Sequence, residues 1–235
     1  MLFRSQAKEY HEKALIIRRK FYGENHPDVA TSYDNLGNVH CSLAQYKQAQ
    51  ECHEKALIIR RKIYGERHSD VARSYDNLGV VYCSLAQYKQ AKEYCEKGLV
   101  IRVQISDEEH ADVARSYNNL GSISWNLAKY NAAKQYHEKA LSIQETIYVE
   151  ENIDVATSYE NLGRVLRSLA QYNQAREHCE KALIILKRFC GDDHPDVARS
   201  YNNLGRVHYD LGQYNQGKQY QIGRASCRER VFRAV

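Results

Sequence analysis

The stretch Ser32-Tyr33-Asp34-Asn35-Leu36-Gly37 decides the fold, because it returns four more times in the pattern Ser-Tyr-x-Asn-Leu-Gly. Its leucine recurs every 42 residues with no insertion, at Leu36, Leu78, Leu120, Leu162 and Leu204. A fixed period of about 20–50 residues is the signature of a stacked repeat array. Each repeat of such an array contacts mainly its neighbours, so the length of 235 residues does not set a number of globular domains.

Each repeat is predicted to contain two helices joined by a tight turn. The apolar stripe of the first helix comprises Val29, Tyr33, Leu36 and His40, at steps of four, three and four residues. The second helix is expected from about Tyr46 to Tyr64, with a glycine directly after it as a C-terminal cap. The first and second tyrosines of each repeat are expected in the core. The five repeats start near residues 28, 70, 112, 154 and 196.

Two local signals bear on how these helices begin and pack. The motif His-x-Asp-Val-Ala, as at His26, precedes four of the first helices and suits helix capping better than metal binding or proton transfer, because it recurs. Gly37 lies inside a first helix, where glycine costs about 1 kcal/mol relative to alanine. We therefore expect another helix to approach it closely.

The two ends of the array are incomplete. Residues 4–22 match a second helix with no first helix before it, and residues 214–220 begin a second helix that does not finish. We expect one repeat array over residues 4–221 and a natural protein that is longer in both directions. Residues 222–235 break the repeat and resemble the translation of a sequencing adapter, so we interpret them as a non-native tail.

Charge and composition narrow the classes of function. The tail carries four Arg and one Glu; without it, 30 basic and 28 acidic residues leave a net charge of +2. This near-neutral balance argues against nucleic acid as a partner. No apolar run approaches the roughly 18 residues that span a bilayer, and no signal-peptide core is present, so we expect no membrane association.

The seven cysteines contain no Cys-x-x-Cys pair, which favours a reducing compartment and a cytoplasmic location. One position of the second helix alternates between His53, Cys95, His137 and Cys179. Such an alternation could provide metal ligands, but small buried side chains explain it more simply, because zinc needs four converging ligands. We expect no metal ion and no cofactor.

The pattern Tyr-x-x-Leu-Gly … Tyr … Ala … Ala resembles the tetratricopeptide repeat. In the first repeat its residues are Tyr33, Leu36, Gly37, Tyr46, Ala49 and Ala56. The longer unit, with His-Pro-Asp-Val-Ala and Ala-Leu-x-Ile-Arg, is similar to the repeat of kinesin light chains and nephrocystin-type proteins. The resemblance implies an all-α solenoid, a right-handed superhelix of antiparallel helix pairs. It does not indicate kinesin itself, because the heptad coiled coil of light chains is absent.

A second stripe on the first helix, at residues 31, 34, 35, 38, 41 and 42, lies opposite the apolar one. The resemblance implies that this stripe lines the concave side of the array. Its constant member is an amide that could hold the backbone of an extended peptide. Alternatively, each amide bonds the neighbouring first helix and sets the stacking, which its constancy favours. These residues are Asn35, Asn77, Asn119, Asn161 and Asn203.

The other positions of this stripe vary and are rich in arginine, with one tryptophan. The residues that we assign to a peptide site with the asparagines are Arg73, Arg115, Arg164, Arg167, Arg199, Arg206 and Trp125. Arginines on one face would attract carboxylates, and the kinesin light chains receive acidic peptides with an aromatic anchor in such a groove. Alternatively, the arginines pair with acids of the same face, namely Asp34, Asp76, Glu160 and Asp210.

We therefore predict a scaffold or adaptor that binds an extended, acidic protein segment along the concave groove. The alternative is a structural or self-assembly arm of a larger receptor or regulator with no peptide of its own. The sequence has no Gly-rich phosphate loop, His-Glu-x-x-His or Gly-x-Ser-x-Gly motif, so we predict neither an enzyme nor a small-molecule substrate.

Overall fold

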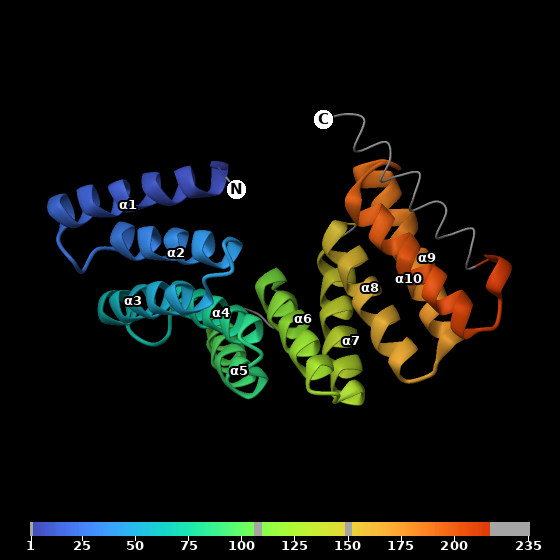
Figure 1. Ribbon diagram of the computed structural model, residues 1–235. Coiled ribbons are helices and arrows are strands. Elements are labelled where there is room, and N and C mark those ends of the chain that lie inside the picture. The colour runs from blue at the N-terminus through green and yellow to red at the C-terminus, as the bar shows by residue number, and fades with distance from the viewer. Residues whose placement is uncertain (1, 106–109, 149–151, 217–235) are drawn as a thin grey trace. The chain divides into compact units, whose positions relative to one another are not determined.

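The computed structural model describes residues 2–105, 110–148 and 152–216. These residues form helices and no strand (Figure 1). The described helices are α1 (Leu2–Tyr22), α2 (Pro27–Ser42), α3 (Tyr46–Tyr64), α4 (Ser69–Ser84), α5 (Tyr88–Ile105), α6 (Ala111–Asn126), α7 (Tyr130–Ile147), α8 (Ile153–Ser168), α9 (Tyr172–Cys190) and α10 (Pro195–Asp210). From α1 to α5, and again from α6 to α10, each helix packs against the next along the chain. The all-α class with antiparallel helix pairs is confirmed.

The even-numbered helices are the first helices of the repeats, and α3, α5, α7 and α9 are second helices. The predicted bounds of the second helix in repeat 1, Tyr46 and Tyr64, are those of α3. Helix α1 corresponds to a second helix, as residues 4–22 indicated. The interpretations of the tail and of residues 217–220 lie outside the described residues.

Helix capping follows the sequence signals. The Nδ1 atom of His26 accepts a hydrogen bond from the backbone N–H of Asp28 at 3.2 Å, and three further histidines cap α4, α6 and α10 in the same way. In α8 the side-chain oxygen of Asn152 replaces the imidazole at 2.8 Å. The predicted capping role of the His-x-Asp motif is confirmed.

The turn between the two helices of a repeat forces one residue into the left-handed region. That residue is an alanine with φ of 57° in four repeats and Gly212, with φ of 73°, in the fifth. A side chain in this conformation costs about 1–2 kcal/mol, because Cβ crowds the following carbonyl oxygen. The four alanines are Ala44, Ala86, Ala128 and Ala170.

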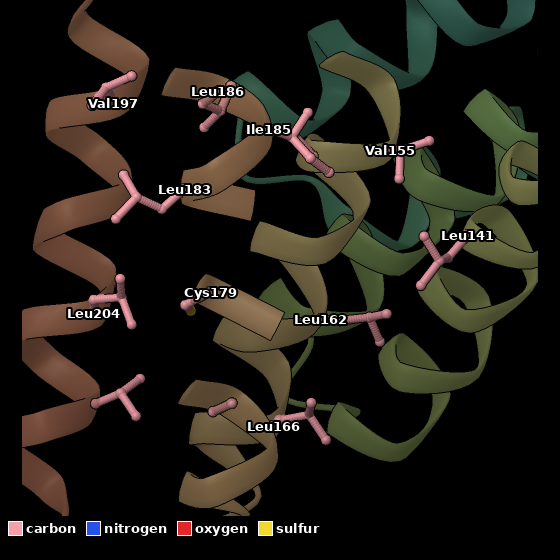
Figure 2. Packing of buried hydrophobic residues seen from close by; sticks show 13 residues of the cluster. Leu141, Val155, Leu162, Leu166, Cys179, Leu183, Ile185, Leu186, Val197 and Leu204 are labelled. Atoms are coloured by element: carbon pink, nitrogen blue, oxygen red, sulfur yellow. The ribbon is translucent and has the colours of Figure 1, made fainter. Parts of the chain in front are cut away.

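The chain divides into two compact units, which we call the N-terminal unit (Met1–Glu108) and the C-terminal unit (Glu109–Val235). The core of the N-terminal unit includes Leu15 of α1, Val29 and Leu36 of α2, and Ile59 of α3. The core of the C-terminal unit includes Leu141 of α7, Leu162 of α8, Ile185 of α9 and Leu204 of α10. Figure 2 shows it as layers of aliphatic side chains between successive helices from α7 to α10.

The interior glycines of the first helices mark close helix contacts, as predicted. A Cβ atom on Gly37 would lie 2.5 Å from the His53 ring, and one on Gly79 would lie 2.3 Å from Sγ of Cys95. The same pairing recurs at Gly121 with His137 and at Gly163 with Cys179. The alternating His/Cys position is therefore a packing position against glycine.

The tyrosines are less uniform than predicted. Tyr33 and Tyr75 are buried, but their counterparts in later repeats are only half-buried. The tyrosine that starts each of α3, α5, α7 and α9 is also half-buried, and Tyr214 is exposed. A lysine ammonium lies over the ring of the first tyrosine in three repeats, for example Lys55 at 5.6 Å from the centroid of Tyr33. The prediction that all of these tyrosines are core residues is wrong, because the lysine stem and water cover the outer edge of the rings.

Candidate functional site: the inner face of the first helices

The residue before each asparagine of the hexapeptide does not lie where the sequence suggested. Asp34, Asp76 and Glu160 were expected on the exposed stripe, but each is only 6% exposed. Asp34 and Asp76 pair with residues of the second helix of the same repeat, and Glu160 pairs with Arg199 of α10, so this part of the prediction is wrong. A charged side chain is buried in this way only where partners hold it.

In repeat 1 those partners are a histidine and an arginine of α3. Oδ1 of Asp34 lies 2.9 Å from Nδ1 of His53, and the guanidinium of Arg60 donates to Oδ2. Burial alone would raise the pKa of Asp34, but the hydrogen bonds and charges of His53 and Arg60 together lower it. Arg60 also donates to the hydroxyl of Ser74 at 2.7 Å, so it joins repeat 1 to repeat 2. Sequence reasoning missed Arg60, which is 2% exposed.

Repeat 2 uses the same chemistry, with Arg102 against Asp76 at 2.6 Å. Repeat 3 replaces both charges by amides. Oδ1 of Asn118 lies 2.8 Å from Nδ1 of His137, and its Nδ2 donates to the hydroxyl of Ser158 at 2.7 Å. Ser158 in turn donates to Oε1 of Gln144, which stands at the position of Arg60. The amide cluster thus connects α6, α7 and α8.

In repeat 4 the second helix no longer supplies the cation. Leu186 stands at the position of Arg60, and Glu160 instead accepts hydrogen bonds from Nε and Nη2 of Arg199, at 3.2 and 2.7 Å. Burial raises the pKa of Glu160, and the half-exposed Arg199 offsets this only in part. Arg199 is therefore paired, as the alternative for the arginines anticipated.

The asparagine column itself is half-buried in every repeat. Among the described members of this column, only Asn161 makes a side-chain hydrogen bond, which it accepts from Arg164 at 3.3 Å. Other positions make the hydrogen bonds between neighbouring first helices, for example Asn118 with Ser158 and Trp125 with Ser168. The expectation that the column asparagines make these bonds is wrong for the described residues.

The remaining arginines occupy three kinds of environment. Arg73 and Arg115 each pair with an aspartate one turn earlier on the same helix, and Arg167 of α8 pairs with Asp210 of α10. Arg206 is exposed, and the structure shows no ionic partner for it within the described ranges. Pairing with acids thus accounts for most of these arginines, although Asp34 and Asp76 pair with second-helix arginines instead.

Trp125 and Arg164 form one cluster in the C-terminal unit. The guanidinium carbon of Arg164 lies 4.7 Å from the centroid of the indole, and the indole N–H donates to the hydroxyl of Ser168 at 3.1 Å. Burial lowers the pKa of Arg164. These contacts connect α6 to α8 and hold the Trp125 ring in place.

A groove with a volume of about 460 Å³ opens beside this cluster, between α6 and α8. It brings together three of the predicted site residues, Arg115, Asn119 and Asn161, and among the described residues no hydrogen-bond partner is shown for the side chain of Asn119. The other residues that line it are Ala111, Asn118, Ser122, Gln144, Tyr148, Asp154 and Thr157. The groove is therefore lined mainly by amides and hydroxyls, with one arginine and one aspartate.

The cysteines show no sign of a reactive site. All six described cysteines are free thiols, and burial raises the pKa of Cys83 to about 11 and that of Cys179 to about 12. The described part of the chain contains no group of three His, Cys, Asp or Glu side chains that could hold a metal ion. None of its helices combines the length and the hydropathy that crossing a bilayer requires.

Comparisons with solved structures support this arrangement of helices. BtubC (BKLC) from P. vanneervenii has 20% sequence identity and a TM-score of 0.82, over 97% of this chain and 92% of that one. Kinesin light chain TPR-like repeats from Podosopora anserina have 21% identity and a TM-score of 0.75, over 88% and 98%. PilF of Pseudomonas aeruginosa has 26% identity and a TM-score of 0.63, over 86% and 78%.

A sequence comparison with curated proteins returns no match. The family model of the tetratricopeptide repeat, in contrast, matches most of the chain, at residues 5–62, 34–99, 70–146 and 154–219. With the repeat pattern and the paired helices, this match shows that the chain belongs to the tetratricopeptide repeat family.

Proposed function

We propose that this chain is a protein-interaction adaptor that binds an extended, acidic peptide segment in the groove between α6 and α8. The observation that carries the proposal is the groove of about 460 Å³, in which Arg115, Asn119 and Asn161 come together. Side-chain amides at the wall of a groove can donate hydrogen bonds to a peptide backbone and accept hydrogen bonds from it. Such contacts do not depend on the side chains of the peptide.

The structural amides below the groove support this role. Asn118 and Gln144 are fixed by His137 and Ser158, so the wall is held rigidly before any ligand arrives. A pre-organised wall loses less conformational entropy on binding. The polar side chains of Asn119 and Ser122 also line the groove, where the backbone of a bound peptide can contact them.

The preference for acidic segments rests on two arginines. Arg115 pairs with Asp112 on the surface, and such exposed pairs contribute only about 0–1 kcal/mol, so a ligand carboxylate can compete for the guanidinium. Arg206 is exposed on α10 of the same unit. Asp154 also lines the groove, so we place the acidic side chains of the ligand toward Arg115.

We assign a binding role and no catalytic step to this groove, and we place the chain in the cytoplasm, where free thiols stay reduced. The family supplies the general expectation of a protein partner. A structural arm without a peptide ligand is the alternative, since most inner-face arginines already have partners.

The experiment measures capture of a random acidic peptide library, and of the same library with Asn and Gln in place of Asp and Glu. We expect Arg115→Glu to weaken capture of the acidic library at least five-fold and to leave helicity unchanged. The matched control is Arg176→Glu, because Arg176 also pairs with an acid one turn away on its own helix but lies outside the groove. Equal capture by wild type and Arg115→Glu would favour the structural-arm alternative.

A further inference from the structure

Asp154 of α8 differs from the aspartates that begin the other first helices. In repeats 2, 3 and 5 this aspartate forms an ion pair with an arginine three positions later on its helix. The pairs are Asp70 with Arg73, Asp112 with Arg115, and Asp196 with Arg199. In repeat 1 the carboxylate lies 3.8 Å from Nδ1 of the capping histidine, but in repeat 4 Thr157 replaces the arginine and Asn152 replaces the histidine. Among the described residues, the structure therefore shows no basic partner for Asp154.

The side chain of Asp154 lines the groove between α6 and α8, together with Tyr148 and Thr157. The hydroxyl of Tyr148 donates to Oδ2 of Asp154 at 3.2 Å. Burial and the negative charge of Asp154 raise the pKa of Tyr148, so the hydroxyl stays protonated and keeps this hydrogen bond near neutral pH. The tyrosine thus orients the carboxylate, and Oδ1 can accept hydrogen bonds from a ligand in the groove.

The next pair of first helices shows which group binds at this repeat position. Arg199 of α10 corresponds to Thr157, and its guanidinium donates to Asp196 of its own helix at 2.6 Å and to Glu160 of α8 at 2.7 Å. A guanidinium at this position therefore connects two neighbouring first helices. Thr157 is too short for such a contact, and its hydroxyl donates to the backbone carbonyl of Ile153 at 3.0 Å. The groove thus keeps the carboxylate but not the arginine that binds it in three other repeats.

The charges beside the groove favour a ligand with a basic group. The charges of Asp154, Arg115 and Asp112 all act on Tyr148, and two of the three are negative. Arg115 already pairs with Asp112 at 2.6 Å, so Asp154 carries the uncompensated charge. A ligand that covered Asp154 with apolar or acidic groups would leave a desolvated carboxylate without a partner. A guanidinium would instead form charge-assisted hydrogen bonds with it.

We propose that the segment bound in this groove carries an arginine, which pairs with Asp154 as Arg199 pairs with Asp196 one repeat later. The proposal rests on the proposed function of the groove as a peptide site, and it narrows the ligand to a segment that carries both charges. The acidic side chains of the segment lie toward Arg115 of α6, and its arginine lies toward Asp154 of α8. Opposite charges on the two walls then fix the direction in which the segment binds.

The test measures capture of four pools of random peptides by the full chain. One pool is acidic, one has Asn and Gln in place of Asp and Glu, and the other two are the same pools with one arginine at a fixed central position. We expect the acidic pool with arginine to be captured at least five-fold better than the acidic pool without it.

Two variants test whether Asp154 is the partner of this arginine. Asp154→Asn should reduce the gain from arginine to less than two-fold. Thr157→Arg should do the same, because it installs the arginine that repeats 2, 3 and 5 carry at this position, which then pairs with Asp154. The matched control is Asp70→Asn, because Asp70 occupies the same repeat position but has its own arginine and lies outside the groove. The control should keep the gain within two-fold of wild type.

The outcomes separate this proposal from the proposed function. Capture of the acidic pool that arginine does not improve would overturn the arginine contact alone, as would a gain that survives both Asp154→Asn and Thr157→Arg. Equal capture of the acidic and neutral pools, with the gain from arginine intact, would reject the acidic preference and support the contact with Asp154. Capture of none of the four pools would overturn both.

Discussion

The N-terminal and C-terminal units bury a polar cluster at the same repeat position, but they build it from different groups. The N-terminal unit uses ion pairs, Asp34 with Arg60 and Asp76 with Arg102. In the C-terminal unit, repeat 3 uses the amides Asn118 and Gln144 with His137. The difference shows that the fold requires a satisfied polar cluster there, whereas the charge of its members can change.

The largest expected effect on stability comes from replacing one member of the buried ion pair in the N-terminal unit. Arg60→Gln leaves the carboxylate of Asp34 buried without its cation, which should cost about 3–5 kcal/mol. The double variant Asp34→Asn/Arg60→Gln copies the amides of repeat 3 and should recover most of that loss. Hydrogen exchange of the backbone amides in α2 and α3 measures both the loss of stability and its recovery, because repeat arrays open locally.

The two units should also differ in acid. Burial, helped by the charge of Arg164, lowers the pKa of His137 from 6.5 to about 3, so the folded C-terminal unit excludes a proton that the unfolded chain binds below pH 6.5. Stability of α6 and α7 should therefore fall as pH drops below 6.5, by about 2 kcal/mol at pH 5. The lowered pKa of Asp34 means that its stabilisation persists until pH falls below 3.8, its ordinary value.

Hydrogen exchange of both units at pH 7 and pH 5 tests this difference. The control is His137→Cys, which installs the residue that repeats 2 and 4 carry at this position as Cys95 and Cys179. The variant should lose the pH dependence of α6 and α7 between these values. An unchanged pH dependence would show that another group is responsible.

The smallest effect concerns a turn that the two units share. Ala86→Gly in the N-terminal unit and Ala128→Gly in the C-terminal unit should each stabilise the protein by about 1 kcal/mol, because glycine tolerates a φ of 57°. Gly212→Ala should destabilise it by a similar amount. Thermal unfolding measures all three, and a gain in only one unit would contradict a turn geometry common to the repeats.

The sequence predicted the helices well and the buried cluster poorly, for physical reasons. Helix bounds and caps follow from local signals, such as the Nδ1 atom of His26 at α2 and the glycine that follows α3. Asp34 and Arg60 are 26 residues apart, and each alone looks like a solvated surface charge. The repeats did carry a signal: where the first position is Asp the second is Arg, and where the first is Asn118 the second is Gln144.

The candidate site was predicted only in outline. Arg115, Asn119 and Asn161 of the second stripe line one groove, since their spacing places them on the same side of successive first helices. Whether they bind a peptide stays a prediction. The second stripe also included the residue at position 34, because a helical pattern cannot tell which edge of a stripe the neighbouring helix covers. The stacking of Arg164 on Trp125 could not be predicted from the sequence, because the two residues lie on different helices and are 39 positions apart.

The most direct test compares two adjacent asparagines of α6. Asn118 holds the cluster through His137 and Ser158, whereas Asn119 lines the groove. We predict that Asn118→Ala lowers stability by about 1–3 kcal/mol, and that Asn119→Ala changes stability by less than about 0.5 kcal/mol but weakens capture of the acidic peptide library. If Asn119→Ala unfolds α6, or captures the library as well as wild type does, the distinction between Asn118 as a structural residue and Asn119 as a binding residue is contradicted.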